Sequence, residues 1–101
     1  MSISDVQLKS NYYGIFDGKG KKIKDLHSSV GDLLGYGDDF IIFEKGSYYD
    51  VYDDEGKRIK SLSVSSLGKF KAASGKTMVF TKGNLIETYD VNGKKLNTRS
   101  A

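Results

Sequence analysis

The stretch IFDGKGKKI at residues 15–23 returns as VYDDEGKRI at residues 51–59 and as TYDVNGKKL at residues 88–96. The second copy begins 36 residues after the first, and the third begins 37 residues after the second. A fixed spacing of this size indicates one supersecondary unit that is used several times, because each copy can bury its apolar face on its neighbour. The repeat therefore predicts the architecture of the chain more directly than any other feature.

Each copy contains a hairpin signal, in which an Asp is followed three residues later by a Gly. The signal occurs in the segments 17–20, 53–56 and 90–93. The Asp side chain accepts a backbone hydrogen bond as the turn opens, and the Gly takes the positive φ that closes a three-residue hairpin. No segment shows a convincing 3.6-residue apolar period of the kind that marks an amphipathic helix. We therefore expect an all-β antiparallel meander.

Four short strands are expected in each complete copy: a small-residue strand, an apolar strand, a tyrosine-bearing strand and a basic strand. The complete copies span residues 28–62 and 65–99. A partial copy at residues 4–26 lacks its opening strand and has only a weak strand signal at residues 6–8. This organisation predicts about ten short strands in a single compact domain that comprises the whole chain.

A four-stranded meander of this length, with a small-residue inner strand and a basic outer strand, resembles a β-propeller blade. The motif KxxxYGIFDxxGKxI at residues 9–23 also resembles the bacterial WG repeat, although the chain has no Trp. The Gly that follows the aromatic residue is kept at Gly14, and Asp50 and Glu87 hold the corresponding positions. The resemblance implies propeller-blade-like repeats and no particular activity.

The number of copies raises the question of closure, because propellers close with about four to eight blades. Fewer than three blades are encoded here. We expect one of three outcomes: a small barrel or sandwich, an open curved sheet, or a ring completed by self-association.

Composition narrows the class of protein. The chain has no Cys, which excludes disulfides, thiolate nucleophiles and cysteine-ligated metal sites. Sixteen basic and thirteen acidic residues give a net charge of +3, a mild excess that does not predict a nucleic-acid partner. The amino-terminal segment has no signal-peptide pattern, and no stretch approaches the apolar length of a membrane span. The expected location is the cytoplasm, with no membrane partner.

No catalytic or metal-binding constellation stands out. His27 is the only histidine, and Ser28, Ser29, Asp25 and Asp32 lie near it in sequence. No nucleophile-elbow motif accompanies them, so a hydrolase centred on His27 is kept only as an alternative. The acidic hairpins run directly into basic strands and lack the closing carboxylate of a calcium loop. We predict no catalytic residue, no cofactor and no metal site.

The tyrosine-bearing strands offer the best candidate surface. By the two-residue period of a strand, Tyr13, Tyr49 and Ile86 share one face with Ile15, Val51 and Thr88, and this face is the better candidate for the core. The opposite face mixes aromatic residues with acids and is expected to be half-exposed. It carries the four candidate partner-binding residues Tyr12, Tyr48, Tyr52 and Tyr89.

These observations predict a non-catalytic binding or interaction module that uses the tyrosine-bearing face, because repeat folds present extended surfaces. The expected partner is another protein, with self-association as a further route to partnership. Half-exposed Tyr beside Lys can also stack on sugars or bases, so a carbohydrate-binding or nucleic-acid-binding protein is the alternative.

Overall fold

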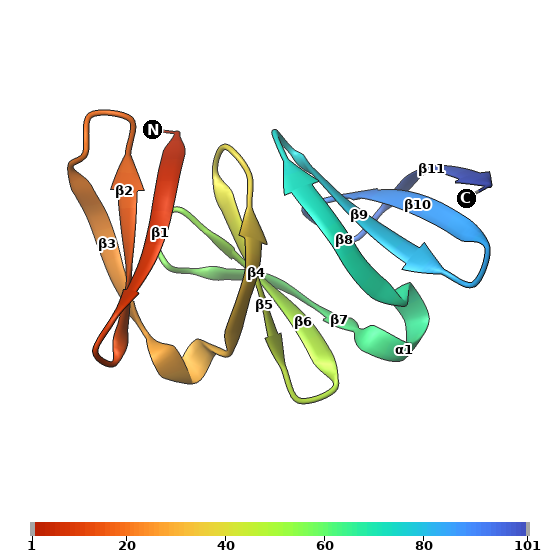
Figure 1. The fold of residues 1–101 in the computed structure, drawn as a ribbon, viewed down its shortest axis with the longest axis horizontal. Helices are drawn as coiled ribbons and strands as arrows, with labels where there is room; N and C mark the ends of the chain where they lie inside the picture. Colours follow the sequence, from red (N-terminus) through yellow and green to blue (C-terminus); the bar gives the residue numbers. More distant parts are fainter. Residues whose placement is uncertain (1, 101) are drawn as a thin grey trace.

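A computed structural model of the protein describes residues 2–100, and within them eleven strands form three antiparallel sheets (Figure 1). Sheet 1 consists of β1 (Ile3–Lys9), β2 (Tyr12–Asp17) and β3 (Lys22–His27). Sheet 2 consists of β4 (Asp32–Tyr36), β5 (Phe40–Lys45), β6 (Tyr48–Asp53) and β7 (Arg58–Ser63). Sheet 3 consists of β8 (Lys69–Ser74), β9 (Thr77–Lys82), β10 (Leu85–Asp90) and β11 (Lys95–Ser100). The 3-10 turn η1 (Ser28–Val30) and the single-turn helix α1 (Val64–Leu67) join the sheets.

The prediction of an all-β antiparallel fold in one compact domain is confirmed. Consecutive strands are neighbours in every sheet, so each sheet is a meander. Sheet 1 has three strands, whereas sheets 2 and 3 have four. β1 is a full strand of seven residues where only a weak strand was expected, and the described residues hold eleven strands against about ten predicted.

The three sheets stand in a row along the 39 Å long axis of the molecule (Figure 1). Within residues 2–100 they neither merge into one barrel nor close into a ring. The described residues form three separate sheets that pack against one another, which is neither the expected barrel nor the expected single curved sheet.

The repeated hairpins form as predicted and explain the turn geometry. The Oδ1 atom of Asp53 accepts the backbone N–H groups of Glu55 and Lys57, both at 2.9 Å, and Gly56 closes the turn with a φ of 84°. Asp17 and Asp90 accept the corresponding pairs of N–H groups at 2.9 to 3.0 Å. The same carboxylate chemistry therefore builds all three hairpins.

The apolar core lies in two clusters, one at each junction between sheets. Strand β5 contributes to both of them, because its successive side chains point to opposite faces. Ile41 and Phe43 face sheet 1, whereas Phe40 and Ile42 face sheet 3, and all four are fully buried. A strand buried on both faces reads as a continuous apolar run, as this one does.

A buried tyrosine hydroxyl links neighbouring sheets at each junction. The Tyr13 hydroxyl donates to the Gly31 carbonyl at 2.9 Å and accepts the Leu33 N–H at 3.3 Å. The Tyr49 hydroxyl makes the same two contacts with Gly68 at 2.6 Å and Phe70 at 3.2 Å. Tyr13, Tyr49, Ile15 and Val51 are all buried, which confirms the predicted core face for sheets 1 and 2.

No helix within the described residues is both long enough and apolar enough to cross a membrane.

Candidate functional site

The four candidate tyrosines divide into two groups. Tyr12 and Tyr48 expose 50% and 53% of their surface, so they are available to a partner. Tyr52 is half-buried, and its ring packs edge-on against Phe43. Tyr89 is only 7% exposed and belongs to the core at the junction of sheets 2 and 3, so the expectation of a half-exposed face does not hold for it.

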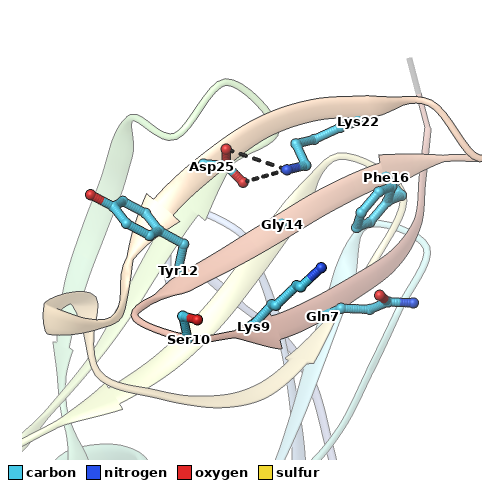
Figure 2. Close-up of a pocket in the computed structure, with 8 residues that line it drawn as sticks. All are labelled: Gln7, Lys9, Ser10, Tyr12, Gly14, Phe16, Lys22 and Asp25. Atoms are coloured by element: carbon cyan, nitrogen blue, oxygen red, sulfur yellow. Dashed lines mark hydrogen bonds and ion pairs between the residues drawn. The ribbon is translucent and has the colours of Figure 1, made fainter.

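A groove opens beside Tyr12 on the outer face of sheet 1 (Figure 2). Its volume is about 250 Å³. Tyr12, Gly14 and Phe16 lie along β2, while Gln7 and Lys9 come from β1 and Lys22 and Asp25 from β3. Ser10 of the β1–β2 turn completes the lining. Because alternate residues of a strand share a face, these side chains project together on the side of sheet 1 that no other sheet covers (Figures 1 and 2).

Gly14 lies at the floor of the groove. Corresponding positions of sheets 2 and 3 carry Asp50 and Glu87, whose side chains fill the space above their strands. A Cβ atom placed on Gly14 would lie 3.0 Å from Cε1 of Phe16, so even a methyl group would press on the groove wall. Gly14 does not have a positive φ, and its backbone conformation therefore places no special demand for glycine.

The residue paired with Gly14 across the strands also differs in sheet 1. Gln7 of β1 is opposite Gly14, whereas Phe43 and Phe80 are opposite the corresponding acids. Both phenylalanines are fully buried at junctions, because a neighbouring sheet covers them. Gln7 instead donates a hydrogen bond from Nε2 to the Asp5 carboxylate at 2.7 Å. The outer face of sheet 1 is thus polar at its edge and aromatic at its centre.

The charged groups of the groove come from β1 and β3. Lys22 Nζ lies 3.3 Å from the nearer carboxylate oxygen of Asp25, and the same amine lies 6.0 Å from the centre of the Phe16 ring. The ion pair is half-exposed, so it contributes little to stability and can exchange for contacts with a ligand. Lys9 adds a second amine at the β1 side of the groove. The site therefore combines two aromatic rings with both hydrogen-bond donors and acceptors.

Sheet 2 carries a related hollow of about 380 Å³ around Tyr48. Its lining residues correspond in position to those of the groove on sheet 1, and they are Lys45, Tyr48, Asp50, Tyr52, Arg58 and Ser61. Asp50 occupies the place of Gly14 and accepts a hydrogen bond from the Ser61 hydroxyl at 2.6 Å. The bottom of this hollow is therefore occupied by two side chains, Asp50 and Ser61, that are hydrogen-bonded to each other.

Sheet 3 closes the corresponding position with an ion pair. Lys95 Nζ lies 2.9 Å from Glu87, and the Tyr89 hydroxyl donates to the same carboxylate at 3.2 Å. The hydrogen bond from Lys95 holds the pKa of Glu87 below its ordinary value, and the same contact raises the pKa of Lys95. Burial raises the pKa of Tyr89, and the nearby Glu87 charge adds to that effect. The open groove of sheet 1 is therefore absent here.

His27 has a local structural role. Its Nδ1 atom accepts the Ser29 N–H at 3.1 Å at the start of η1, and its ring packs edge-on against Tyr12 with 5.4 Å between centres. Asp25, the acid nearest to it in sequence, forms its ion pair with Lys22 instead. His27 therefore caps the start of η1 and contacts the Tyr12 ring.

The residues that sequence reasoning missed are those around Tyr12. Phe16, Lys9 and Gln7 have ordinary identities, and nothing in their spacing marks a site. The one signal in the sequence was Gly14, because the corresponding positions of the other two copies both carry acids, Asp50 and Glu87. Within residues 2–100, no group of three or more His, Cys, Asp or Glu side chains is placed to hold a metal ion.

Comparison of the chain with protein-family models, with curated proteins and with solved structures found no match. The resemblance of residues 9–23 to the WG repeat therefore stays a prediction, and the geometry of the groove has to support the functional proposal.

Proposed function

We propose that the protein is a non-catalytic binding module with two equivalent ligand surfaces, the outer face of sheet 1 around Tyr12 and the hollow around Tyr48 on sheet 2. The observation that carries this proposal is the exposure of Tyr12 and Tyr48, each about half-exposed and each beside a hollow. A large aromatic side chain gains free energy on burial, so two of them held at equivalent exposed positions indicate a surface meant to be covered.

The surroundings of the two tyrosines support a binding role. Each tyrosine is paired across its hairpin with a lysine, Lys9 or Lys45, and each hollow is also lined by a second basic residue, Lys22 or Arg58. Aromatic residues and arginine are enriched at protein interfaces, so Tyr12, Tyr48 and Arg58 are the residues that favour a binding role. A protein partner is the first expectation, and the three sheets are proposed to be propeller-blade-like repeats that display the surface.

The test compares partner capture by matched variants. Tagged wild-type protein, the double variant Tyr12→Ala/Tyr48→Ala and the control Leu85→Ala are used to capture partners from a cell extract, with quantification by mass spectrometry. Leu85 holds the corresponding position of sheet 3 and is also exposed, but it does not line either hollow. We expect the double variant to lose its specific partners while the control keeps them, with both variants melting close to the wild type.

Equal capture by all three proteins would show that the tyrosine surface is not the binding surface. A double variant that unfolds would instead show that these rings stabilise the fold, and the role assigned to them would be wrong.

A further inference from the structure

We propose that the groove on sheet 1 binds a carbohydrate, with one pyranose ring held between Tyr12 and Phe16 above Gly14. This inference rests on the proposed binding function, and for the groove on sheet 1 it names a carbohydrate in place of the protein partner expected for the surface as a whole. It follows from three properties of the groove: its size, its aromatic walls and its mixture of polar groups.

The size of the groove suits a single sugar ring. Its volume of about 250 Å³ lies just below the range of about 300–1,000 Å³ that is typical of pockets for drug-sized ligands. Gly14 leaves the floor beside Phe16 open, since a Cβ atom at that position would lie 3.0 Å from Cε1 of the Phe16 ring. A flat or filled face, like that around Glu87 on sheet 3, has no comparable room.

The aromatic walls suit the C–H face of a sugar. The face of an aromatic ring carries partial negative charge and attracts weakly positive hydrogens. Tyr12 presents half of its surface at one end of the groove and Phe16 lies at the other, both on β2 (Figure 2). The edge-on contact of His27 holds the Tyr12 ring in place. A preorganised ring loses little conformational freedom when a ligand stacks on it.

The polar groups suit hydroxyls. A sugar hydroxyl both donates and accepts hydrogen bonds, so its site needs partners of both kinds. Lys9 and Lys22 supply donors, Asp25 supplies acceptors, and Gln7 supplies both from one amide. The Lys22–Asp25 pair is exposed enough to turn toward a ligand without leaving a buried charge behind.

The same groups argue against the two other classes of polymer. A phosphate backbone is bound by cations, and the Asp25 carboxylate in the wall would repel it. An extended peptide docks by pairing its backbone with the open edge of a sheet. The groove lies instead across the face of sheet 1, where β2 is paired on both sides, so it offers no backbone ladder to a peptide.

The experiment is a titration of isotope-labelled protein, followed by NMR, with defined oligomers. Cellotetraose and chitotetraose represent neutral glycans, tetragalacturonate represents acidic ones, and an oligothymidine and a polyglutamate peptide represent the competing classes. We expect at least one oligosaccharide to give saturable shifts in the Tyr12, Gly14 and Phe16 signals. Saturation by tetragalacturonate alone would identify an acidic glycan, with its carboxylate at Lys9.

Variants connect the binding to the groove. Tyr12→Ala should weaken oligosaccharide binding at least about tenfold because it removes one stacking face. Gly14→Ala should weaken it similarly by filling the floor, with no strained φ to unfold the strand. Leu85→Ala should bind as the wild type does. Melting curves of all three variants show whether a loss of binding comes from the site or from the fold.

No saturable shift with any of the three oligosaccharides would overturn the proposal, as would binding that Gly14→Ala leaves unchanged. Tighter binding of the oligothymidine, weakening steeply with salt, would assign the groove to nucleic acid. If no oligosaccharide binds but Tyr12→Ala/Tyr48→Ala still loses its captured partners, the ligand class is wrong and the binding function stands.

Discussion

At the scale of single residues, one hydroxyl group per junction holds neighbouring sheets together. The Tyr49 hydroxyl is bonded to both the Gly68 carbonyl and the Phe70 N–H, two backbone groups that precede or open β8. Removing the hydroxyl leaves a partly buried donor and acceptor without these partners. A buried polar group left without a hydrogen-bond partner lowers the free energy of unfolding by more than the net contribution of the hydrogen bond itself.

We therefore expect Tyr49→Phe to lower the free energy of unfolding by about 1–3 kcal/mol, and Tyr13→Phe to act similarly. Urea denaturation followed by circular dichroism measures the change. Tyr48→Phe is the matched control, because the Tyr48 ring is exposed, and its effect should stay within about 0.5 kcal/mol. Equal stabilities for the Tyr49 and Tyr48 variants would show that the linking hydrogen bonds carry no net stability.

The Glu87–Lys95 pair makes stability depend on pH. Folding lowers the pKa of Glu87. The stabilisation of the folded state by the ionised Glu87 side chain is therefore complete above the ordinary Glu pKa, and it is lost as pH falls through the lowered pKa. Folding raises the pKa of Lys95. The stabilisation by the protonated Lys95 side chain is therefore complete below the ordinary Lys pKa, and it is lost as pH rises through the raised pKa.

Wild-type protein should therefore be more stable than Glu87→Gln at neutral pH, and the difference should begin to shrink as pH falls below the ordinary Glu pKa of about 4. Urea midpoints at a series of pH values from about 7 to about 3 measure the difference. Glu55→Gln, at an exposed hairpin, is the control and should follow the wild type throughout. A gap between wild type and Glu87→Gln that stays constant down to the lowest pH would contradict the assigned ion pair.

The two-residue period identified the covered face correctly in sheets 1 and 2 and wrongly in sheet 3. Tyr13 and Tyr49 follow the two-residue period, and the structure buries them as expected. Tyr89 lies on the face expected to be half-exposed, yet it is buried, because its sheet packs through that face against sheet 2. The period shows which residues share a face, but only the packing of the sheets decides which face is covered.

At the scale of elements, the repeated hairpin has a second role that its sequence does not reveal. Gly56 packs on Leu26 of sheet 1, and Gly93 packs in the same way on Leu62 of sheet 2. A Cβ atom on either glycine would lie 2.6 Å from the Cδ2 atom of that leucine. The turn signal was readable because it is local, whereas the contact joins residues about 30 positions apart, a distance that local patterns do not cover.

The three hairpins provide their own control for this contact. Gly20, Gly56 and Gly93 have φ values of 80°, 84° and 84°, but nothing lies within 4 Å of a Cβ atom on Gly20. Gly20→Ala should therefore cost only the strain of the left-handed backbone, about 1–2 kcal/mol. Gly56→Ala and Gly93→Ala should each cost about 1–3 kcal/mol more, because the added methyl group forces the leucine and the hairpin apart.

Chemical denaturation of the three alanine variants under one set of conditions measures the difference directly. If all three lose the same stability, the hairpins are turns alone and make no energetic contribution between sheets.

At the scale of the whole molecule, the parts that join sheets are missing at both ends of the row. Ile86 holds the position of Tyr13 and Tyr49 in sheet 3 and has no hydroxyl to donate. Arg99 holds the position of Leu26 and Leu62. Sheet 1 has no strand corresponding to β4 or β8, which are the strands that receive the tyrosine hydroxyl.

The outer face of sheet 1 is also more polar than the junctions. Asp5 and Gln7 of β1 stand where β5 has Ile41 and Phe43. Stacked repeats need polar outer faces at their ends, because an apolar end would recruit further copies. The spacing of the repeat could not show this, since it describes what the copies share, while the ends depend on the positions at which they differ.

We therefore expect the protein to be a monomer of 11.2 kDa, which light scattering coupled to size-exclusion chromatography measures. If two copies met end to end, sheet 3 of one copy would have no tyrosine hydroxyl to donate, and sheet 1 of the other would have no strand to receive it. The contact between copies would therefore not reproduce the internal junctions. Leu96 is the most exposed large apolar residue of sheet 3, at 51%, and Leu96→Lys should change neither the mass nor the melting temperature appreciably. A wild-type dimer or trimer that Leu96→Lys dissociates would show that sheet 3 is covered by another copy, and would make the groove on sheet 1 a candidate for the opposite side of that interface.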